Sequence, residues 1–323
     1  MCIRDRVCPF AGQHQSTATA AEGVAFYVSP SGNDANSGVT LEEPFATIEK
    51  ARNAIRELKR TGRFAAPVTV YLRGGSHQLR EGIVFAPEDS GTPRSPVTYT
   101  SYQNEKPAIT GGCRITGWSR HEGNVWKVEL PDVRQGRWKF RQIFVNGQKR
   151  RRARIPNEGF LRVVGFPDGG RNVHYHTDCR RFEFAPGDLK PTWTNLSDVE
   201  VIVYHFWTDS HLPIESIDTA ANIVTFKHKA GKVFTDDFTS NGARYIVENV
   251  FEGLDQPGEW YLNRKTGVLY YIPMPGEDMA AAEVVAPQSA DFIRFEGDPL
   301  SRRFVENINI RNLSFMYTNW ELP

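Results

Sequence analysis

The chain has 323 residues and a formal net charge of +1 at pH 7, with 40% hydrophobic and 24% charged residues. This near-neutral balance argues against a nucleic-acid or anionic-membrane partner, because either would need a surplus of basic side chains. No stretch reaches the ~18–20 apolar residues of a membrane-spanning helix, so the composition is that of an ordinary globular protein.

Residues 1–6, with the sequence MCIRDR, resemble the translation of a sequencing adapter. We therefore exclude them from the fold and expect the true start to be missing. Residues 7–23 are small and polar, with an Ala-Thr-Ala-Ala run near their end. They are either a signal-peptide remnant, which would make this a secreted or periplasmic bacterial protein, or a disordered lead-in.

Residues 24–112 begin with a short strand, Phe26–Val28, that runs into a turn rich in Gly, Asn and Asp. Pro44–Arg60 predicts one amphipathic helix, with Thr47 as its N-cap and Gly62 just past its end. The apolar residues that share one stripe of this helix are Ile48, Ala51, Ile55 and Leu58.

Short strands separated by Gly and Pro follow the helix. The first, Val68–Leu72, points its alternate apolar residues toward one face, and others are expected at 83–85, 97–100 and 108–109. Strands this short are typical of the rungs of a β-solenoid rather than of a sandwich. The helix would then cover the open first rung, as terminal caps do in repeat folds.

Residues 113–285 have longer strands and hairpin signals. The pair Asn146-Gly147 predicts a tight turn between two strands. Further strands are expected at Val199–Phe206, Asn222–Lys227 and Tyr261–Ile272, the last broken at Thr266-Gly267. We interpret this stretch as a β-rich domain inserted into the solenoid.

Residues 286–323 return to the solenoid pattern. Asn307–Phe315 predicts two short strands joined by a corner, and the chain ends soon afterwards at Pro323. A sheet left unpaired exposes an edge that native proteins avoid. We therefore expect the chain to be truncated at its C-terminus.

The first part of the chain resembles right-handed parallel β-helix glycoside hydrolases. The motifs that carry this likeness are Tyr27–Asp34, Pro44–Ile48 and Val68–Gly75. The resemblance implies a pectin-lyase-like, mainly β fold: the N-terminal part of a right-handed parallel β-helix with an N-terminal capping helix.

The inserted stretch resembles the insertion domain of glycoside hydrolase family 141, with families 120 and 110 as more distant relatives. The motifs here are Phe140–Gly147, Arg152–Asn157, Tyr245–Asn249 and Leu254–Leu262. The family implies a secreted hydrolase that acts on plant or algal polysaccharide with a pair of carboxyl groups. In such enzymes this pair lies on rungs C-terminal to the insertion, so we assign no catalytic residue in this chain.

Two other functions remain open for this scaffold. A polysaccharide lyase would use Arg or Lys as a base and often Ca²⁺, whereas an adhesion protein would bind carbohydrate without catalysis. A fold alone does not decide between these functions. The insertion motifs favour the hydrolase.

The segment Tyr204–His211 holds the densest group of side chains suited to sugars. Aromatic faces stack on sugar rings and histidines bond hydroxyl groups, so His205, Trp207 and His211 are the candidate substrate-binding residues. The alternative is that Trp207 lies in the core, as tryptophan mostly does in β domains, and that the histidines are ordinary strand or turn residues.

The basic run Lys149–Arg154 either forms salt bridges or lines a site for acidic sugars, because uronic-acid carboxylates suit arginine forks. A single such run in a neutral chain is a poor nucleic-acid signal. Arg244 and Glu248 are four residues apart and are expected to pair with each other.

For two acidic stretches we prefer a structural interpretation to a catalytic or binding one. Asp236 and Asp237 would point to opposite faces of a strand, so they could not share one glycosidic bond, and we expect a solvated loop. Asp255–Tyr261 is either an acidic site beside an aromatic platform or a structural turn. The turn is favoured, with Trp260 and Leu262 facing inward.

No metal or other cofactor is expected. Cys8, Cys113 and Cys179 are widely spaced and form no CxxC pair, which leaves a zinc site or disulfide framework unsupported. His174 and His176 would share one strand face, but no second cluster completes a tetrahedral site.

Overall fold

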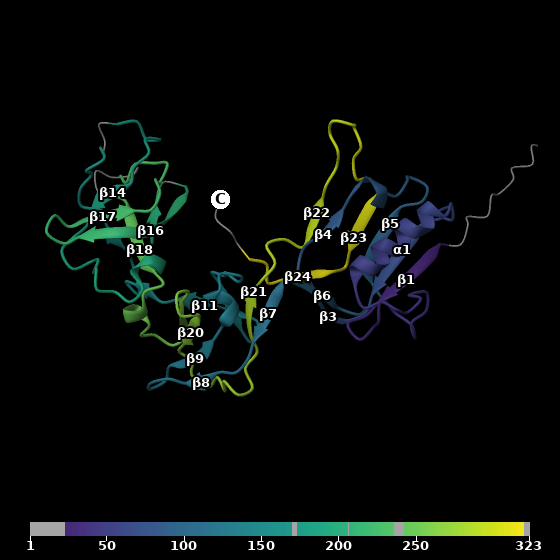
Figure 1. The fold of residues 1–323 in the computed structure, drawn as a ribbon, viewed down its shortest axis with the longest axis horizontal. Helices are drawn as coiled ribbons and strands as arrows, with labels where there is room; N and C mark the ends of the chain where they lie inside the picture. Colours follow the sequence, from purple (N-terminus) through teal and green to yellow (C-terminus); the bar gives the residue numbers. More distant parts are fainter. Residues whose placement is uncertain (1–22, 170–172, 206, 236–241, 320–323) are drawn as a thin grey trace, which may run out of the picture. The chain divides into compact units, whose positions relative to one another are not determined.

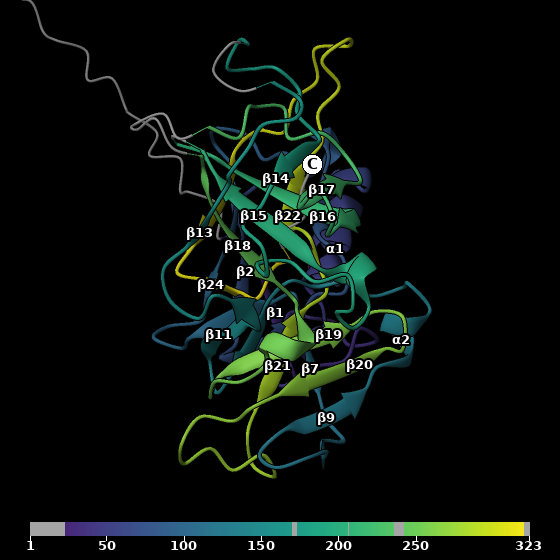
Figure 2. The same ribbon diagram turned by 90° about the vertical axis from the view of Figure 1, so that its left-hand side faces the viewer.

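We describe a computed structural model of the chain. It describes residues 23–169, 173–205, 207–235 and 242–319. The predictions for residues 1–6, most of 7–23, Cys8 and Asp236-Asp237 lie outside this part. The fold is mainly β, as predicted, and divides into two compact units (Figures 1 and 2). The first holds described residues up to 77, 83–109 and 293–314, and the second holds 78–82, 110–292 and 315–319.

The first unit is built on a sheet of four parallel strands in the order β1-β2-β5-β23. Their bounds are Val24–Val28, Val68–Leu72, Val97–Ser101 and Ile308–Arg311. The strands pair in register, so that residues at equal positions stack in columns. One column contains Phe26, Val70, Tyr99 and Ile310, and the first three are buried.

A second parallel pair in this unit joins β4 (Ile83–Phe85) to β22 (Ile293–Phe295). The 3₁₀ turn η1 (Pro87–Asp89) follows β4. The short strands β3, β6 and β24 lie where the chain passes from one unit to the other, at Gly75–Gln78, Pro107–Thr110 and Ser314–Met316.

The helix α1 (Ile48–Arg60) also belongs to the first unit. Thr47 caps it as predicted, because its Oγ1 accepts a hydrogen bond from the Lys50 backbone N–H at 3.1 Å. The predicted start at Pro44 is wrong. Phe45 instead exchanges backbone hydrogen bonds of 2.9 Å with Tyr27 and Ser29, and these contacts hold it in an extended conformation.

The second unit contains an eight-stranded sheet in the order β7-β21-β10-β11-β19-β20-β9-β8. Its strands, in chain order, span Gly112–Ile115, Ser119–Arg120, Trp126–Glu129, Ile143–Val145, Gln148–Arg152, Glu259–Asn263, Val268–Tyr271 and Val284–Pro287. The one-turn helix α2 (Pro131–Arg134) follows β9. Trp260, Leu262, Leu269 and Tyr271 are among the core residues of this sheet.

The same unit contains a seven-stranded sheet in the order β12-β18-β15-β16-β17-β14, with β13 also paired to β18. Its strands span Arg154–Ile155, Leu161–Arg162, Arg181–Glu183, Glu200–Tyr204, Asp209–Asp218, Ile223–Phe226 and Arg244–Glu248. Short 3₁₀ turns lie at η2 (Leu196–Asp198) and η3 (Phe251–Gly253). One face of this sheet packs into a large apolar core that includes Phe182, Val201, Val203 and Tyr245.

The hairpin predicted at Asn146-Gly147 is confirmed. Both residues have positive φ angles, 51° and 76°, and Val145 pairs with Gln148 across the turn. This is the backbone geometry of a two-residue turn that matches the twist of the flanking strands. No helix among the described residues has the length and apolar character of a membrane span.

Candidate functional site

Alternation along β15 separates a core face from a second, more polar face. Val201 and Val203 point into the apolar core, so Glu200, Ile202 and Tyr204 point to the other side of the sheet. The neighbouring strands extend this polar face, because Tyr204 pairs with Asp209, Ile202 with His211, and Glu200 with Glu248.

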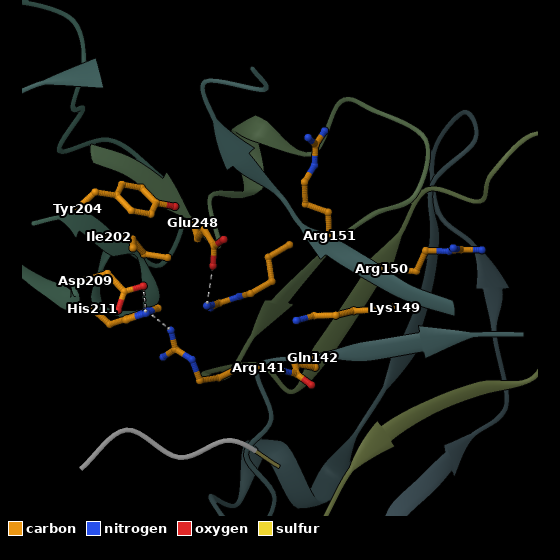
Figure 3. A pocket seen from close by; sticks show the side chains of 11 residues that line it. Arg141, Gln142, Lys149, Arg150, Arg151, Ile202, Tyr204, Asp209, His211 and Glu248 are labelled. Atoms are coloured by element: carbon orange, nitrogen blue, oxygen red, sulfur yellow. Dashed lines mark hydrogen bonds and ion pairs between the residues drawn. The ribbon is translucent and has the colours of Figure 1, made fainter. Parts of the chain in front are cut away.

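A cavity of about 490 Å³ lies against this face within the second unit (Figure 3). Its other wall comes from β11 and from the segment that leads into β10. Tyr204, Asp209 and His211 lie on one side of the cavity, and Arg141 and Lys149 lie on the other. The lining residues are Arg141, Gln142, Lys149, Arg150, Arg151, Arg152, Ile202, Tyr204, Asp209, His211 and Glu248.

The carboxylate of Glu200 lies beneath the cavity and joins its two walls. Its side chain is 7% exposed and forms ion pairs with Arg141 and with Arg152, the latter at 2.6 Å. Burial alone would raise the pKa of Glu200, but the two guanidinium groups lower it to about 2. Arg152 also reaches Glu248 at 3.4 Å, so it bridges two carboxylates that face each other across neighbouring strands.

The imidazole of His211 is fixed between Arg141 and Asp209. Arg141 can only donate, so its 2.8 Å contact makes Nδ1 of His211 the acceptor and leaves the proton on Nε2, 3.5 Å from Asp209. Burial and the Arg141 charge lower the pKa of His211. The ring is therefore neutral at pH 7.

The arginines of β11 differ from Lys149 in how they are paired. Arg150 pairs with Glu277, a carboxylate that also accepts a 2.5 Å hydrogen bond from the Tyr271 hydroxyl. Arg151 pairs with the buried Glu259 at 3.2 Å. Lys149 is exposed, and its ammonium forms no ion pair or hydrogen bond within the described part of the chain.

The structure places the three predicted substrate-binding residues in different surroundings. His205 is buried, bonds the Ser210 hydroxyl at 2.9 Å and lies against Phe234 in the core. Trp207 is 71% exposed, so it is not a core residue, and Lys232 lies 5.9 Å from the centre of its ring. Of the three, His211 lines the cavity. Sugar binding by any of them stays a prediction.

The predicted Arg244–Glu248 pair and the two histidines at 174 and 176 differ from expectation in the structure. Arg244 does not pair with Glu248, because residues four apart on a strand are too distant to meet. Arg244 instead lies over the Phe160 ring, 5.0 Å from its centre. His174 and His176 lie around a turn rather than on a strand. Among the described residues, no group of three or more His, Cys, Asp or Glu has the arrangement of a metal site.

The structural interpretation of Asp255–Tyr261 agrees with the contacts of Glu259. This side chain is fully buried, and its carboxylate accepts backbone hydrogen bonds from Asp255 and Gln256, which hold the turn. Burial raises the pKa of Glu259 despite these bonds. Trp260 and Leu262 face the core as predicted, although Tyr261 between them is equally buried.

The two segments singled out from the sequence, Lys149–Arg154 and Tyr204–His211, contain seven of the eleven lining residues, but the contacts that join them were missed. Arg141, Glu200 and Glu248 come from separate segments, and the arginine contacts of the two glutamates span 48 to 96 residues along the chain. A local signal existed at Glu200, where a carboxylate interrupts a run of β-branched residues.

The residues that line this cavity lie within a stretch of the chain that matches a family model. Residues 123–274 match the model of the GH141 insertion domain. The resemblance to glycoside hydrolase family 141 that the sequence motifs indicated is therefore confirmed.

Solved structures and curated proteins add to this finding. A glycoside hydrolase structure is 28% identical to the chain at a TM-score of 0.77, and the match covers 92% of this chain and 51% of that one. This chain therefore spans about half the length of that enzyme. The structure of XylC with xylose has 17% identity and a TM-score of 0.38, too low to show a shared fold.

Among curated proteins, the uncharacterized protein YwoF of Bacillus subtilis (strain 168) is 35% identical over 89 residues. The match covers 28% of this chain and 16% of YwoF.

Proposed function

We propose that this chain is part of a secreted glycoside hydrolase that cleaves plant or algal polysaccharide. The observation that carries the proposal is the match of residues 123–274 to the model of the GH141 insertion domain. The likeness of 92% of the chain to a glycoside hydrolase structure supports it. The secreted location and the plant or algal substrate are part of the proposal.

The scaffold that we propose is a right-handed parallel β-helix capped by α1. Its support is the in-register parallel pairing of β1, β2, β5 and β23, since segments from opposite ends of the chain stack in the same columns. The buried face of α1, with Ile48, Ala51 and Ile55, suits a helix that covers the end of such a stack.

Catalysis in this proposal uses a pair of carboxyl groups, one of which must be protonated to act as an acid. The cavity does not suit that role. Its two lining carboxylates, Glu248 and Asp209, contact Arg152 and His211, and Glu200 beneath it is ionised and held by two arginines. We therefore assign the cavity to binding. The catalytic pair is assigned to the part of the glycoside hydrolase architecture that this chain does not span.

The test is the release of reducing ends from pectic, xylan and algal polysaccharides. It is made with this chain and with the full-length product of its gene. We expect hydrolysis by the full-length product and none by this chain. Hydrolysis by this chain would contradict the assignment of the cavity, and unsaturated products would identify a lyase. Binding without cleavage by the full-length product would identify an adhesion protein.

A further inference from the structure

The two walls of the cavity have opposite chemistry. One carries the cations Arg141, Lys149 and Arg151, and the other carries the acceptors Tyr204 and Asp209 (Figure 3). Five of the eleven lining residues are cationic and two are anionic. A ligand that fills this space therefore needs a negative group at one end and hydrogen-bond donors at the other.

The cationic wall has charge left for a ligand at Lys149. Glu200, Glu259 and Glu277 lie beneath this wall and neutralise its arginines, as the ion pairs above show. They leave the Lys149 ammonium, which extends toward the cavity, without a described anion. Arg151, two residues along the same strand and at 45% side-chain exposure, keeps donors open to solvent.

The opposite wall suits hydroxyl groups. The Asp209 carboxylate is 47% exposed, and Tyr204, its partner on the neighbouring strand, also lines the cavity. Ile202, next along the same face, provides an apolar surface that suits the C–H face of a sugar ring. The fixed tautomer of His211 keeps the polarity of this wall constant near neutral pH.

We propose that the cavity binds one hexuronic acid residue of an acidic polysaccharide. Its carboxylate lies against Lys149, and its ring hydroxyls lie against Asp209 and Tyr204. The volume of about 490 Å³ is within the range of ligand pockets, roughly 300–1,000 Å³. This inference rests on the proposed function and names the sugar class that the insertion domain recognises.

A neutral sugar fits this site less well. It would leave the Lys149 ammonium without an anion, and it would gain no charge-assisted hydrogen bond from the cationic wall. A phosphate or sulfate would occupy the cationic wall but would not use the acceptors opposite, where Asp209 would repel it.

The experiment is calorimetric titration of this chain with three uronate-containing trisaccharides: trigalacturonate, trimannuronate and a glucuronosyl-xylobiose. Each is compared with its methyl ester, which removes the charge and keeps the sugar. We expect at least one free acid to bind, its ester to bind about tenfold more weakly, and added salt to weaken only the free acid.

Variants locate the binding. Lys149→Gln is expected to weaken the free acid about tenfold and to leave the ester unchanged, as befits the loss of one charge-assisted contact. Lys190→Gln, a change at another exposed lysine of the same unit, is the matched control. Asp209→Asn is expected to weaken acid and ester equally, because it changes the wall that holds the hydroxyls.

The outcomes separate this inference from the proposed function. Three results would each overturn the uronate site: equal binding of acid and ester, binding unaffected by Lys149→Gln, or no binding of any of the three trisaccharides. Hydrolysis of a polysaccharide by the full-length gene product would still support the proposed function in those cases.

Discussion

The ion pairs of Glu200 provide the sharpest test of how the two sheets of the second unit are joined. Glu200→Gln removes a carboxylate that is 7% exposed and leaves Arg141 and Arg152 beside a neutral amide. The difference between the ordinary pKa of 4.5 and about 2 corresponds to about 3 kcal/mol of folding free energy at neutral pH. Removing one partner of a buried pair costs about 3–5 kcal/mol, which agrees with this value.

The stability lost on Glu200→Gln must also decrease as the pH falls. The pKa of Glu200 is lower in the folded chain than in the unfolded one, so its stabilisation is complete above about pH 4.5. It is lost as the pH falls toward about 2. The gap between wild type and Glu200→Gln should therefore be about 3 kcal/mol at pH 7 and close to zero near pH 2.

Hydrogen exchange of the β15 backbone amides measures this gap without assuming that the two units unfold together. Glu215→Gln on β16 is the matched control, because Glu215 pairs with Arg180 at the surface with both side chains more than 40% exposed. Its cost should stay below about 1 kcal/mol. A Glu200→Gln cost as small as that of the control, or one independent of pH, would refute the reasoning.

Three further predictions concern Glu259, Gly147 and Trp207. Burial raises the pKa of Glu259, so wild type should lose stability relative to Glu259→Gln as the pH rises above 4.5 in chemical denaturation; the opposite trend would contradict this. Gly147→Ala should cost about 1 kcal/mol in the same assay, because φ is 76° and no atom crowds the new Cβ; an unchanged midpoint would rule out the strained turn. Trp207→Ala should change stability by less than about 0.5 kcal/mol. If affinity electrophoresis shows unchanged polysaccharide binding, Trp207 has no binding role.

Local features of the fold could be predicted because their physics is local. The Asn146-Gly147 turn, the Thr47 cap and the strand at Glu200–Tyr204 each depend on residues close in sequence. The start of α1 could not be predicted in this way. Phe45 is held by backbone contacts to Tyr27 and Ser29, which no pattern within the helix reveals.

The candidate site could be predicted in part, because its segments are visible in the sequence but the contacts between them are not. The basic run Lys149–Arg154 is visible in the sequence, and its predicted ion pairs are present. Four of its residues also line the cavity, whereas the predicted binding of acidic sugars stays a proposal. Its acidic partners are not visible, because Glu200, Glu259 and Glu277 reach it through sheet pairing and packing between distant segments. Residue type alone favoured His205, although strand alternation turns that side chain into the core.

The alternation along β15 also has an evolutionary consequence. Val201 and Val203 maintain the core, whereas Ile202 and Tyr204 meet only the cavity side. Selection can therefore replace Ile202 or Tyr204, and so change the shape and polarity of the cavity, while the apolar core on the other face of the strand is inherited unchanged. Glu200, on the same face as these two residues, is constrained, because its ion pairs with Arg141 and Arg152 stabilise the fold.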